Sequence, residues 1–386
     1  MQEKIPFNKP YLTGKEVHYM YQAVHSGKLS GNGIFTKKCQ DFFVKNYHFS
    51  KCLLTTSCTD ALEMCAILAK IGPGDEVIVP SYTFVSTALA FVRQGAKIIF
   101  ADSYKDNPNI DADNIENLIT NKTRIIVPVH YAGVACDMDK IMALATKYNL
   151  LLIEDAAQAI DSYYISPQTG EKKALGSIGH LSAFSFHETK NIISGEGGML
   201  VINNENYNHR AEIIWEKGTN RAEFFRGEVN KYGWVDIGSS FLPSEIIAAF
   251  LWAQLENIEI IQNKRKQLWN AYYERLQPLA DKGFFKIPVI PTYATNNAHM
   301  FYLLCNSFEE RCQLIDFLKQ NEVLSVFHYL SLHSSEFNKD QHRERELPNC
   351  DYFTDHLLRL PMYFELEVND IDRITTLINN FCIKYQ

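Results

Sequence analysis

Short apolar runs alternate with helix-like patterns through the first two thirds of the chain. Most of these runs are continuous, which is typical of strands that are covered on both faces. Between them, Thr59–Ile71 is predicted as a helix with Thr59 as its N-cap, and Met138–Tyr148 as a helix capped by Asp137. The predicted strands are Cys52–Thr55, Glu76–Val79, Lys97–Ala101, Arg124–Val129, Leu150–Glu154, Leu181–Phe186 and Met199–Ile202.

This alternation predicts an α/β fold with a mostly parallel sheet and helices on both of its faces. The pattern changes near Pro243, where residues 244–276 are predicted as one long helix with an apolar side. We therefore expect a large domain over residues 1–243, and a smaller α+β domain over residues 244–386 that includes this helix. Beyond the helix the sequence predicts strands at His299–Leu304 and Leu324–Tyr329, helices at Phe308–Gln320 and Asn369–Cys382, and a polar surface loop at Ser334–Cys350.

Composition narrows the class of protein. A net charge of −7 and the lack of a long basic run argue against a general nucleic-acid surface. The N-terminus has no apolar segment of the secretory type, and no run of about 18 apolar residues predicts a membrane span. The nine cysteines form no C-x-x-C pair, which indicates free thiols in a reducing compartment. We expect a cytoplasmic protein without a structural zinc site.

Candidate chemistry follows the ends of four predicted strands, where ligands bind in sheets of this type. Asp155 ends the first, although a lone aspartate there is more often a helix cap or a surface charge. The string "TTSCTDAL" places hydroxyls and backbone N–H groups at a strand-to-helix turn that suits a phosphate. Phe84 follows a third strand, and Ser185 and Lys190 follow a fourth.

Pyridoxal phosphate (PLP) is the one ligand that would use all four features. It needs a lysine amine to form an imine, a carboxylate against the pyridine nitrogen, a phosphate cup and a flat ring to stack on. No single feature is specific, and their conjunction carries the prediction. The glycine-rich string "SGKLSGNG" lacks the spacing of a phosphate-binding loop, since Gln22 and Leu29 occupy the positions that would decide it. No carboxylate sits between His328 and His333 in a metalloprotease pattern, so no metal is expected.

At this point the sequence resembles the DegT/StrS family of sugar-nucleotide aminotransferases, which have the aspartate aminotransferase fold (PLP fold type I). The resemblance covers nearly the whole chain, from "SGKLSGNGIFTKKC" to "VFHYLSLH". The strings "PGDEVIVPSYTFVST", "PVHYAGVACDMD", "EDAAQ" and "SFHETKN" followed by "GEGG" are together highly specific. Within the family, residues 216–240 most resemble an enzyme that aminates a dTDP-linked 4-keto-6-deoxy sugar at C4, with L-glutamate as donor.

The resemblance implies roles for individual residues. Lys190 would carry the cofactor as an imine and move protons, Asp155 would pair with the pyridine nitrogen, Gln158 would bond the ring hydroxyl, and Phe84 would stack on the ring. The phosphate would be held by Ser57, Cys58, Thr59 and Ser185. The candidates for substrate contacts are His187, Lys217, Arg221, Tyr329 and His333.

The family also implies a homodimer with shared active sites. A partner-subunit asparagine approaches the phosphate in the family, and Ser240 takes its place here. A hydroxyl reaches less far than an amide, so this contact is open.

Three alternatives stay open beside this interpretation. A dehydratase relative would have histidine where Lys190 stands, so the lysine speaks against it. A PLP-binding regulatory protein would not need the lysine, the acid and the glutamine together. The third alternative keeps the chemistry and changes the product, to a gluco-configured 4-amino sugar or a 3-amino sugar, because residue types do not give the shape of the pocket.

Overall fold

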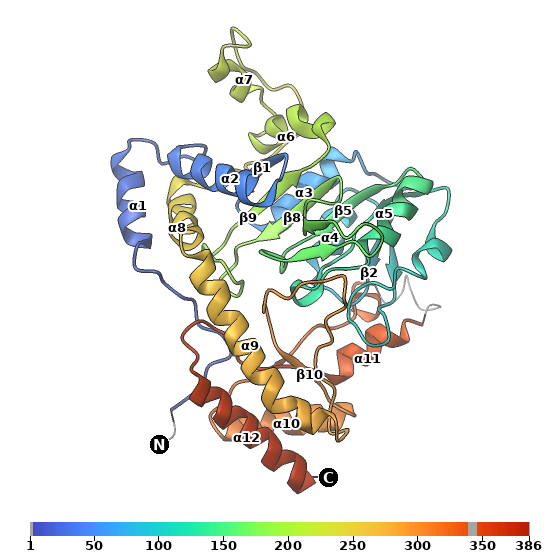
Figure 1. Ribbon diagram of the computed structural model, residues 1–386. Helices are drawn as coiled ribbons and strands as arrows, with labels where there is room; N and C mark the ends of the chain where they lie inside the picture. Colours follow the sequence, from blue (N-terminus) through green and yellow to red (C-terminus); the bar gives the residue numbers. More distant parts are fainter. Residues whose placement is uncertain (1–2, 339–345, 386) are drawn as a thin grey trace.

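The computed structural model describes residues 3–338 and 346–385. Its centre is a seven-stranded sheet in the order β1-β9-β8-β5-β4-β2-β3 (Figure 1). Only β9 runs antiparallel to its neighbours, so the predicted mostly parallel sheet is confirmed. The strands are β1 Lys51–Thr55, β2 Glu76–Pro80, β3 Lys97–Ala101, β4 Thr123–Ile126, β5 Leu151–Asp155, β8 Leu181–Ser185 and β9 Gly198–Ile202.

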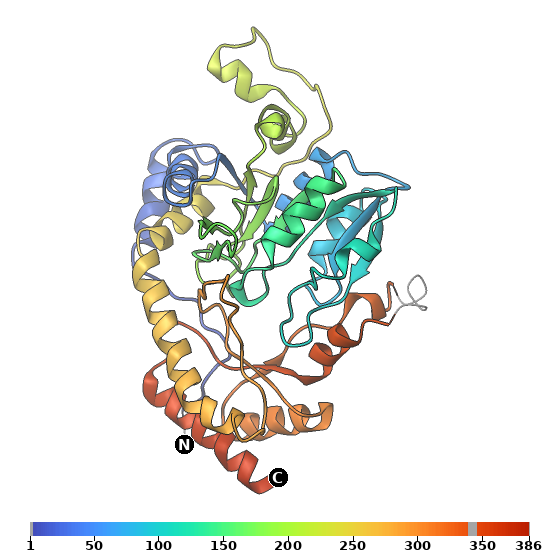
Figure 2. The ribbon, with the colours of Figure 1, turned by 45° about the vertical axis from the view of Figure 1, so that its right-hand side comes forward.

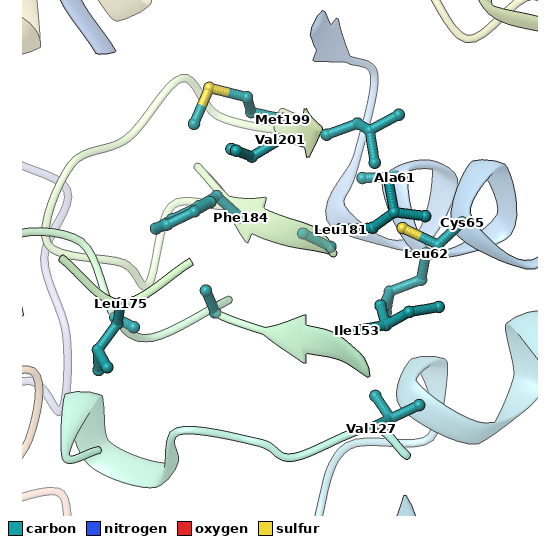
Figure 3. Packing of buried hydrophobic residues seen from close by; sticks show 14 of the residues in the cluster. Ala61, Leu62, Cys65, Val127, Ile153, Leu175, Leu181, Phe184, Met199 and Val201 are labelled. Atoms are coloured by element: carbon teal, nitrogen blue, oxygen red, sulfur yellow. The ribbon is translucent and has the colours of Figure 1, made fainter. Parts of the chain in front are cut away.

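Helices cover both faces of this sheet, which explains the continuous apolar runs. Figure 3 shows Ala61, Leu62 and Cys65 of α3 facing Leu181 of β8 and Ile153 of β5. Every residue of β2, β8 and β9 is buried. The helices of this part are α1 Glu16–His25, α2 Ile34–Tyr47, α3 Cys58–Leu68, α4 Ser86–Val92, α5 Met138–Lys147, α6 Asn208–Trp215, α7 Arg221–Arg226 and α8 Glu245–Leu255. Shorter elements are η1 Ile115–Leu118, η2 Tyr131–Gly133, η3 Glu205–Tyr207 and the hairpin β6 Tyr163–Ile165 with β7 Lys172–Ala174.

A second sheet, with its own core, is formed by the C-terminal part of the chain. It has the order β10-β12-β11 and is antiparallel throughout. The long helix α9 runs from the large sheet to this smaller one and packs there against α12 (Figure 2). The elements are α9 Ile258–Ala280, β10 Tyr302–Leu304, α10 Phe308–Gln320, β11 Val326–Phe327, η4 Leu332–Ser334, α11 Pro348–His356, β12 Leu357–Arg359 and α12 Val368–Tyr385. The domain boundary at residue 243 stays a prediction.

Two details of the predicted helices are wrong. The long helix expected over 244–276 is two helices, because the chain leaves helical geometry at Asn257, whose side-chain Nδ2 donates to the Ala253 carbonyl at 2.9 Å. The N-cap of α3 is Ser57, whose Oγ accepts from the Asp60 N–H at 3.1 Å. Thr59 instead bonds the Ser86 hydroxyl at 2.8 Å.

The elements predicted for the C-terminal part of the chain are confirmed in part. Helix α10 matches its predicted bounds, whereas strands β10 and β11 are shorter than expected. The predicted loop Ser334–Cys350 overlaps η4 at one end and α11 at the other, and its residues 339–345 lie outside the described residues. In the part of the chain that the structure describes, no helix has the length and apolar character needed to cross a membrane.

Candidate active site

A cavity of about 530 Å³ lies at the carboxyl ends of the parallel strands. Residues of the large sheet line one part of it, including Asp155 at the end of β5 and Ser185 at the end of β8. The smaller sheet contributes Arg359 of β12, and the N-terminal segment contributes Phe7 and Asn8. The site therefore combines segments that are far apart in the sequence.

One end of the cavity is built around the N-terminus of α3. Ser57, Cys58 and Thr59 line it and follow strand β1 directly. Gly198 pairs with Thr55 on β1 and with Ser185 on β8, so it lies between the two segments that carry the hydroxyls. A Cβ on Gly198 would approach the Ser57 carbonyl carbon at 2.3 Å and the Cys58 nitrogen at 2.4 Å. Glycine is required here because backbone packs directly on backbone.

Asp155 is a buried carboxylate without an ion pair among the described residues. The Thr87 hydroxyl donates to Oδ2 at 2.7 Å, and the Ala157 N–H donates to Oδ1 at 3.1 Å. Burial raises the pKa of this carboxyl, while the two hydrogen bonds and the positive charges of Lys190 and His130 act in the opposite direction. A cationic ligand in the cavity would keep Asp155 ionised.

Gln158 and Phe84 flank the same cavity. The Ala132 N–H donates to Gln158 Oε1 at 2.6 Å, and Gln158 Nε2 donates to the Tyr329 hydroxyl at 3.1 Å. The ring of Phe84 is 56% exposed and lies 6.1 Å from that of Tyr329, measured between centroids. An apolar ring that lines a cavity yet stays open to solvent is suited to stacking on a flat ligand.

Lys190 follows β8 in a tightly held loop and lines the cavity. Its neighbour Asn191 anchors the loop, since its Nδ2 donates to Gln262 at 2.9 Å and its Oδ1 lies 2.8 Å from His299 Nδ1. Burial lowers the pKa of the Lys190 amine, as does the positive charge of Arg359, whereas Cys58 and Asp155 raise it. The lysine is thus a partly buried amine with enhanced access to its neutral, nucleophilic form.

The other predicted site residues divide into two groups. His187 and Tyr329 line the cavity, and His187 lies 3.7 Å from Glu196 at the same cavity. His333 is buried elsewhere, with its Nδ1 2.8 Å from the Ser81 hydroxyl. Lys217, Arg221 and Ser240 also lie outside the cavity. They belong to residues 208–240, a segment called the arm below, which carries α6 and α7 (Figure 1).

Sequence reasoning missed three residues of the site. Thr87 orients Asp155, His328 lines the cavity with its Nδ1 3.0 Å from the Tyr131 hydroxyl, and Arg359 brings a guanidinium. A signal for Arg359 existed, because a cation stands alone in the apolar run "LLRLPM". Among the described residues, no group of three or more metal-ligating side chains is found.

The arrangement fits PLP. The cofactor's phosphate matches the N-terminus of α3, and the aldehyde matches the Lys190 amine. The protonated pyridine nitrogen matches the carboxylate of Asp155, which has no ion pair among the described residues. All three groups line one cavity.

Comparison with known proteins agrees with this geometry. Residues 10–379 match the DegT/DnrJ/EryC1/StrS aminotransferase family. The chain belongs to this family. The predicted function is thereby confirmed as far as an aminotransferase family, and the predicted fold is confirmed as that of the fold type I aminotransferases.

Individual relatives extend over almost the whole length. The uncharacterised protein MJ1066 of Methanocaldococcus jannaschii is 31% identical over 376 residues, which is 95% of each chain. The spore coat polysaccharide biosynthesis protein SpsC of Bacillus subtilis is 29% identical over 384 residues, 96% of this chain and 95% of its own. The PLP form of the putative sugar aminotransferase Spr1654 of Streptococcus pneumoniae matches with a TM-score of 0.88 at 24% identity, covering 99% of each chain.

Proposed function

We propose that this protein is a PLP-dependent sugar-nucleotide aminotransferase. Its reaction converts dTDP-4-keto-6-deoxy-D-glucose and L-glutamate to dTDP-4-amino-4,6-dideoxy-D-galactose and 2-oxoglutarate, which is the activity of dTDP-4-amino-4,6-dideoxygalactose transaminase. The product would serve surface polysaccharide synthesis, of the enterobacterial common antigen or O-antigen type. The observation that carries the proposal is the meeting of Lys190 and Asp155 in one cavity of an aminotransferase-family chain.

In this proposal the bound cofactor supplies an electron sink for the reacting carbon. Lys190 would hold the cofactor, and its amine, once free, would move the proton to and from the α-carbon of glutamate. Asp155 would pair with the pyridine nitrogen and keep it protonated, and Thr87 holds Asp155 in place. With the sugar bound in place of the donor, the Lys190 amine would move the proton of the sugar carbon that receives the amine.

The sugar substrate is supported by two features. The segment 216–240 resembles that of the C4 aminotransferase, and SpsC, a relative of this chain, is named for polysaccharide biosynthesis. The rival products, a gluco-configured 4-amino sugar and a 3-amino sugar, require a different orientation of the sugar above Lys190. A regulatory protein would bind PLP without releasing 2-oxoglutarate.

The arm that carries α7 supports a homodimer. Figure 1 shows it projecting away from both sheets, and its side chains include Phe225, Trp234 and Ile237, which are 70%, 85% and 56% exposed. Apolar groups of this size on a projecting segment favour burial against a second copy. In such a dimer, Lys217, Arg221 and Ser240 of one subunit would approach the cavity of the other.

NMR of the product made from dTDP-4-keto-6-deoxy-D-glucose and glutamate tests the proposal. An axial amine at C4 is expected. An equatorial amine at C4 would reject the galacto configuration, and an amine at C3 would reject the position. Production of neither amino sugar nor 2-oxoglutarate by PLP-loaded protein would favour the regulatory alternative.

A further inference from the structure

A histidine of the smaller domain reaches the loop that presents the lysine. His299 lies in the segment that leads into β10, is 7% exposed and lines the cavity. Its Nδ1 lies 2.8 Å from Oδ1 of Asn191, the residue that follows Lys190, although the two are 108 positions apart in the sequence. The imidazole is therefore in contact with the lysine loop through one hydrogen bond.

The other hydrogen bonds of Asn191 determine which ring nitrogen carries the proton. Asn191 Nδ2 donates to the backbone carbonyl of Asn297 at 2.9 Å and to Gln262 Oε1 at 2.9 Å. A backbone carbonyl can only accept, so the amide nitrogen faces Asn297 and the amide oxygen faces the ring. His299 Nδ1 is then the donor. Burial and the positive charge of Lys190 lower the pKa of His299 well below its usual range, so the ring is neutral.

The backbone that carries this ring is held by a buried arginine. Arg265 of α9 donates from Nε to the Ala298 carbonyl at 3.0 Å and from Nη2 to the His299 carbonyl at 2.6 Å. Ala298 has a φ of 53°, in the left-handed region, which a residue with a Cβ adopts only where its surroundings hold it. Asn297 Oδ1 also accepts from the His299 N–H at 3.0 Å. The ring thus projects from backbone that three hydrogen bonds fix.

The same segment is bonded to a second part of the site. Asn297 Nδ2 donates to the carbonyls of Gln158 and Ile160, at 2.8 Å each. Residues 297–299 therefore connect the turn that carries Gln158 with the loop that carries Lys190. A connection of this kind fixes the distance between two groups that must meet one ligand.

We propose that His299 is a positioning residue, which donates from Nδ1 to Asn191 and thereby holds Lys190 within reach of the cofactor aldehyde. The inference rests on the role proposed for Lys190 above. A restrained loop loses less conformational freedom when its amine becomes bonded to the cofactor, so the bond forms more readily. A neutral imidazole suits this position because it adds no further positive charge beside the lysine.

Two forms of the cofactor separate the lysine from the rest of the cavity. In the proposed function PLP becomes bonded to Lys190. Pyridoxamine phosphate has the same ring and phosphate but carries an amine in place of the aldehyde, so it cannot form this bond. Each is titrated into cofactor-free protein and followed by absorbance. Damage to the whole cavity weakens the binding of both, whereas a misplaced lysine weakens that of PLP alone.

Two substitutions isolate the Nδ1 hydrogen bond. The amide nitrogen of asparagine is attached to Cγ, as Nδ1 is in histidine, so His299→Asn can keep the donor to Asn191. In His299→Gln the amide lies one bond further out, like Nε2, and the donor is lost. We expect His299→Gln to bind PLP about 5- to 50-fold more weakly than wild type, and His299→Asn to stay within about threefold. Both should bind pyridoxamine phosphate within about threefold of wild type.

The matched control is His356→Gln, because His356 Nδ1 lies 2.7 Å from the Tyr352 carbonyl and the residue does not line the cavity. Melting temperatures check folding. The inference is overturned if His299→Gln leaves PLP affinity unchanged, if it weakens PLP and pyridoxamine phosphate equally, or if His299→Asn loses as much PLP affinity as His299→Gln.

Asn191→Ala removes the acceptor of the same hydrogen bond and carries the test if His299→Gln does not fold. The same split is expected, with weaker PLP and nearly unchanged pyridoxamine phosphate, and combining the two substitutions should add little. Equal losses for the two ligands in Asn191→Ala would contradict the inference. If wild-type protein aminates no keto sugar, the proposed function fails, and the comparison of the two ligands still decides the role of His299.

Discussion

Asp155 ends strand β5, Lys190 lies in the loop after the neighbouring parallel strand β8, and both line the same cavity. The pairing of Asp155 with Ala183 brings the two strands side by side, so the carboxylate and the amine approach one ligand from fixed backbone positions. Their charges act on each other, since the Asp155 carboxylate raises the pKa of the lysine and the lysine lowers that of the carboxyl. This coupling is the basis of the chemistry proposed above.

Replacing Asp155 by Asn removes the charge while it preserves the shape of the side chain. We expect the glutamate half-reaction to slow by about 100- to 1,000-fold, the cost typical of losing a preorganised electrostatic contact. The melting temperature should change little, since an asparagine oxygen can still accept from the Ala157 N–H and its amide can donate to the Thr87 hydroxyl. Single-turnover absorbance measures the rate, with the exposed Asp106→Asn as control. A rate near that of wild type would show that Asp155 does not act on the cofactor.

The reactivity of Lys190 should depend on pH with an inflection below 10.5, the ordinary value for lysine, because its pKa is lowered. The neutral amine is the reactive form, so PLP uptake by the apo-protein should rise with pH up to that inflection. Arg359→Gln removes a charge that lowers this pKa and should move the inflection up. Asp155→Asn removes a charge that raises it and should move the inflection down. Rates of absorbance change against pH test this, and the opposite order would contradict the electrostatics.

Gly198→Ala should disturb the N-terminus of α3. The added methyl would meet the Ser57–Cys58 peptide, so backbone must shift, at a cost of about 1–3 kcal/mol in the free energy of unfolding. We expect weaker PLP binding as well, measured by equilibrium titration. Gly72→Ala is the matched control, because a Cβ there meets nothing within 4 Å. Equal effects of the two substitutions would show that the close approach has no role.

The exposed apolar side chains of the arm predict that the protein forms a dimer. Light scattering should give about twice the chain mass of 44.3 kDa for wild-type protein. Trp234→Asp places a charge on the most exposed aromatic of the arm and should shift the mass toward a single chain. Val289→Asp, on a residue that is 63% exposed elsewhere, should have no such effect. A wild-type protein that stays monomeric at all concentrations would exclude the shared active site.

Much of the site was visible in the sequence because it follows strand ends. Asp155 ends its strand, while Ser57 and Lys190 lie in the loops that follow theirs, and parallel strands bring such ends to one edge. The same rule does not find Arg359, which comes from the antiparallel sheet of the other core. Its place in the same cavity as Lys190 depends on how the two sheets pack, and the pattern of one strand does not carry that information.

Other features depended on single side-chain contacts. The break between α8 and α9 occurs where the Asn257 side chain donates a hydrogen bond to the Ala253 carbonyl. The spacing of apolar residues along the two helices is almost unchanged by this break, so the sequence pattern does not reveal it. His333 has the residue type of a substrate contact, yet tertiary packing places it against Ser81. The sequence contains the string GEGG after Lys190, but only the structure shows that Gly198 packs against the Ser57 peptide.

The most direct test of the account is the identity of the residue that binds the cofactor. Purified protein incubated with PLP is reduced with borohydride, digested and analysed by peptide mass spectrometry, with Lys190→Ala in parallel. We predict visible absorbance before reduction, a phosphopyridoxyl group on Lys190, and no labelled peptide from the variant. A protein that stays colourless with PLP, or a label on another lysine that persists in Lys190→Ala, would contradict the account.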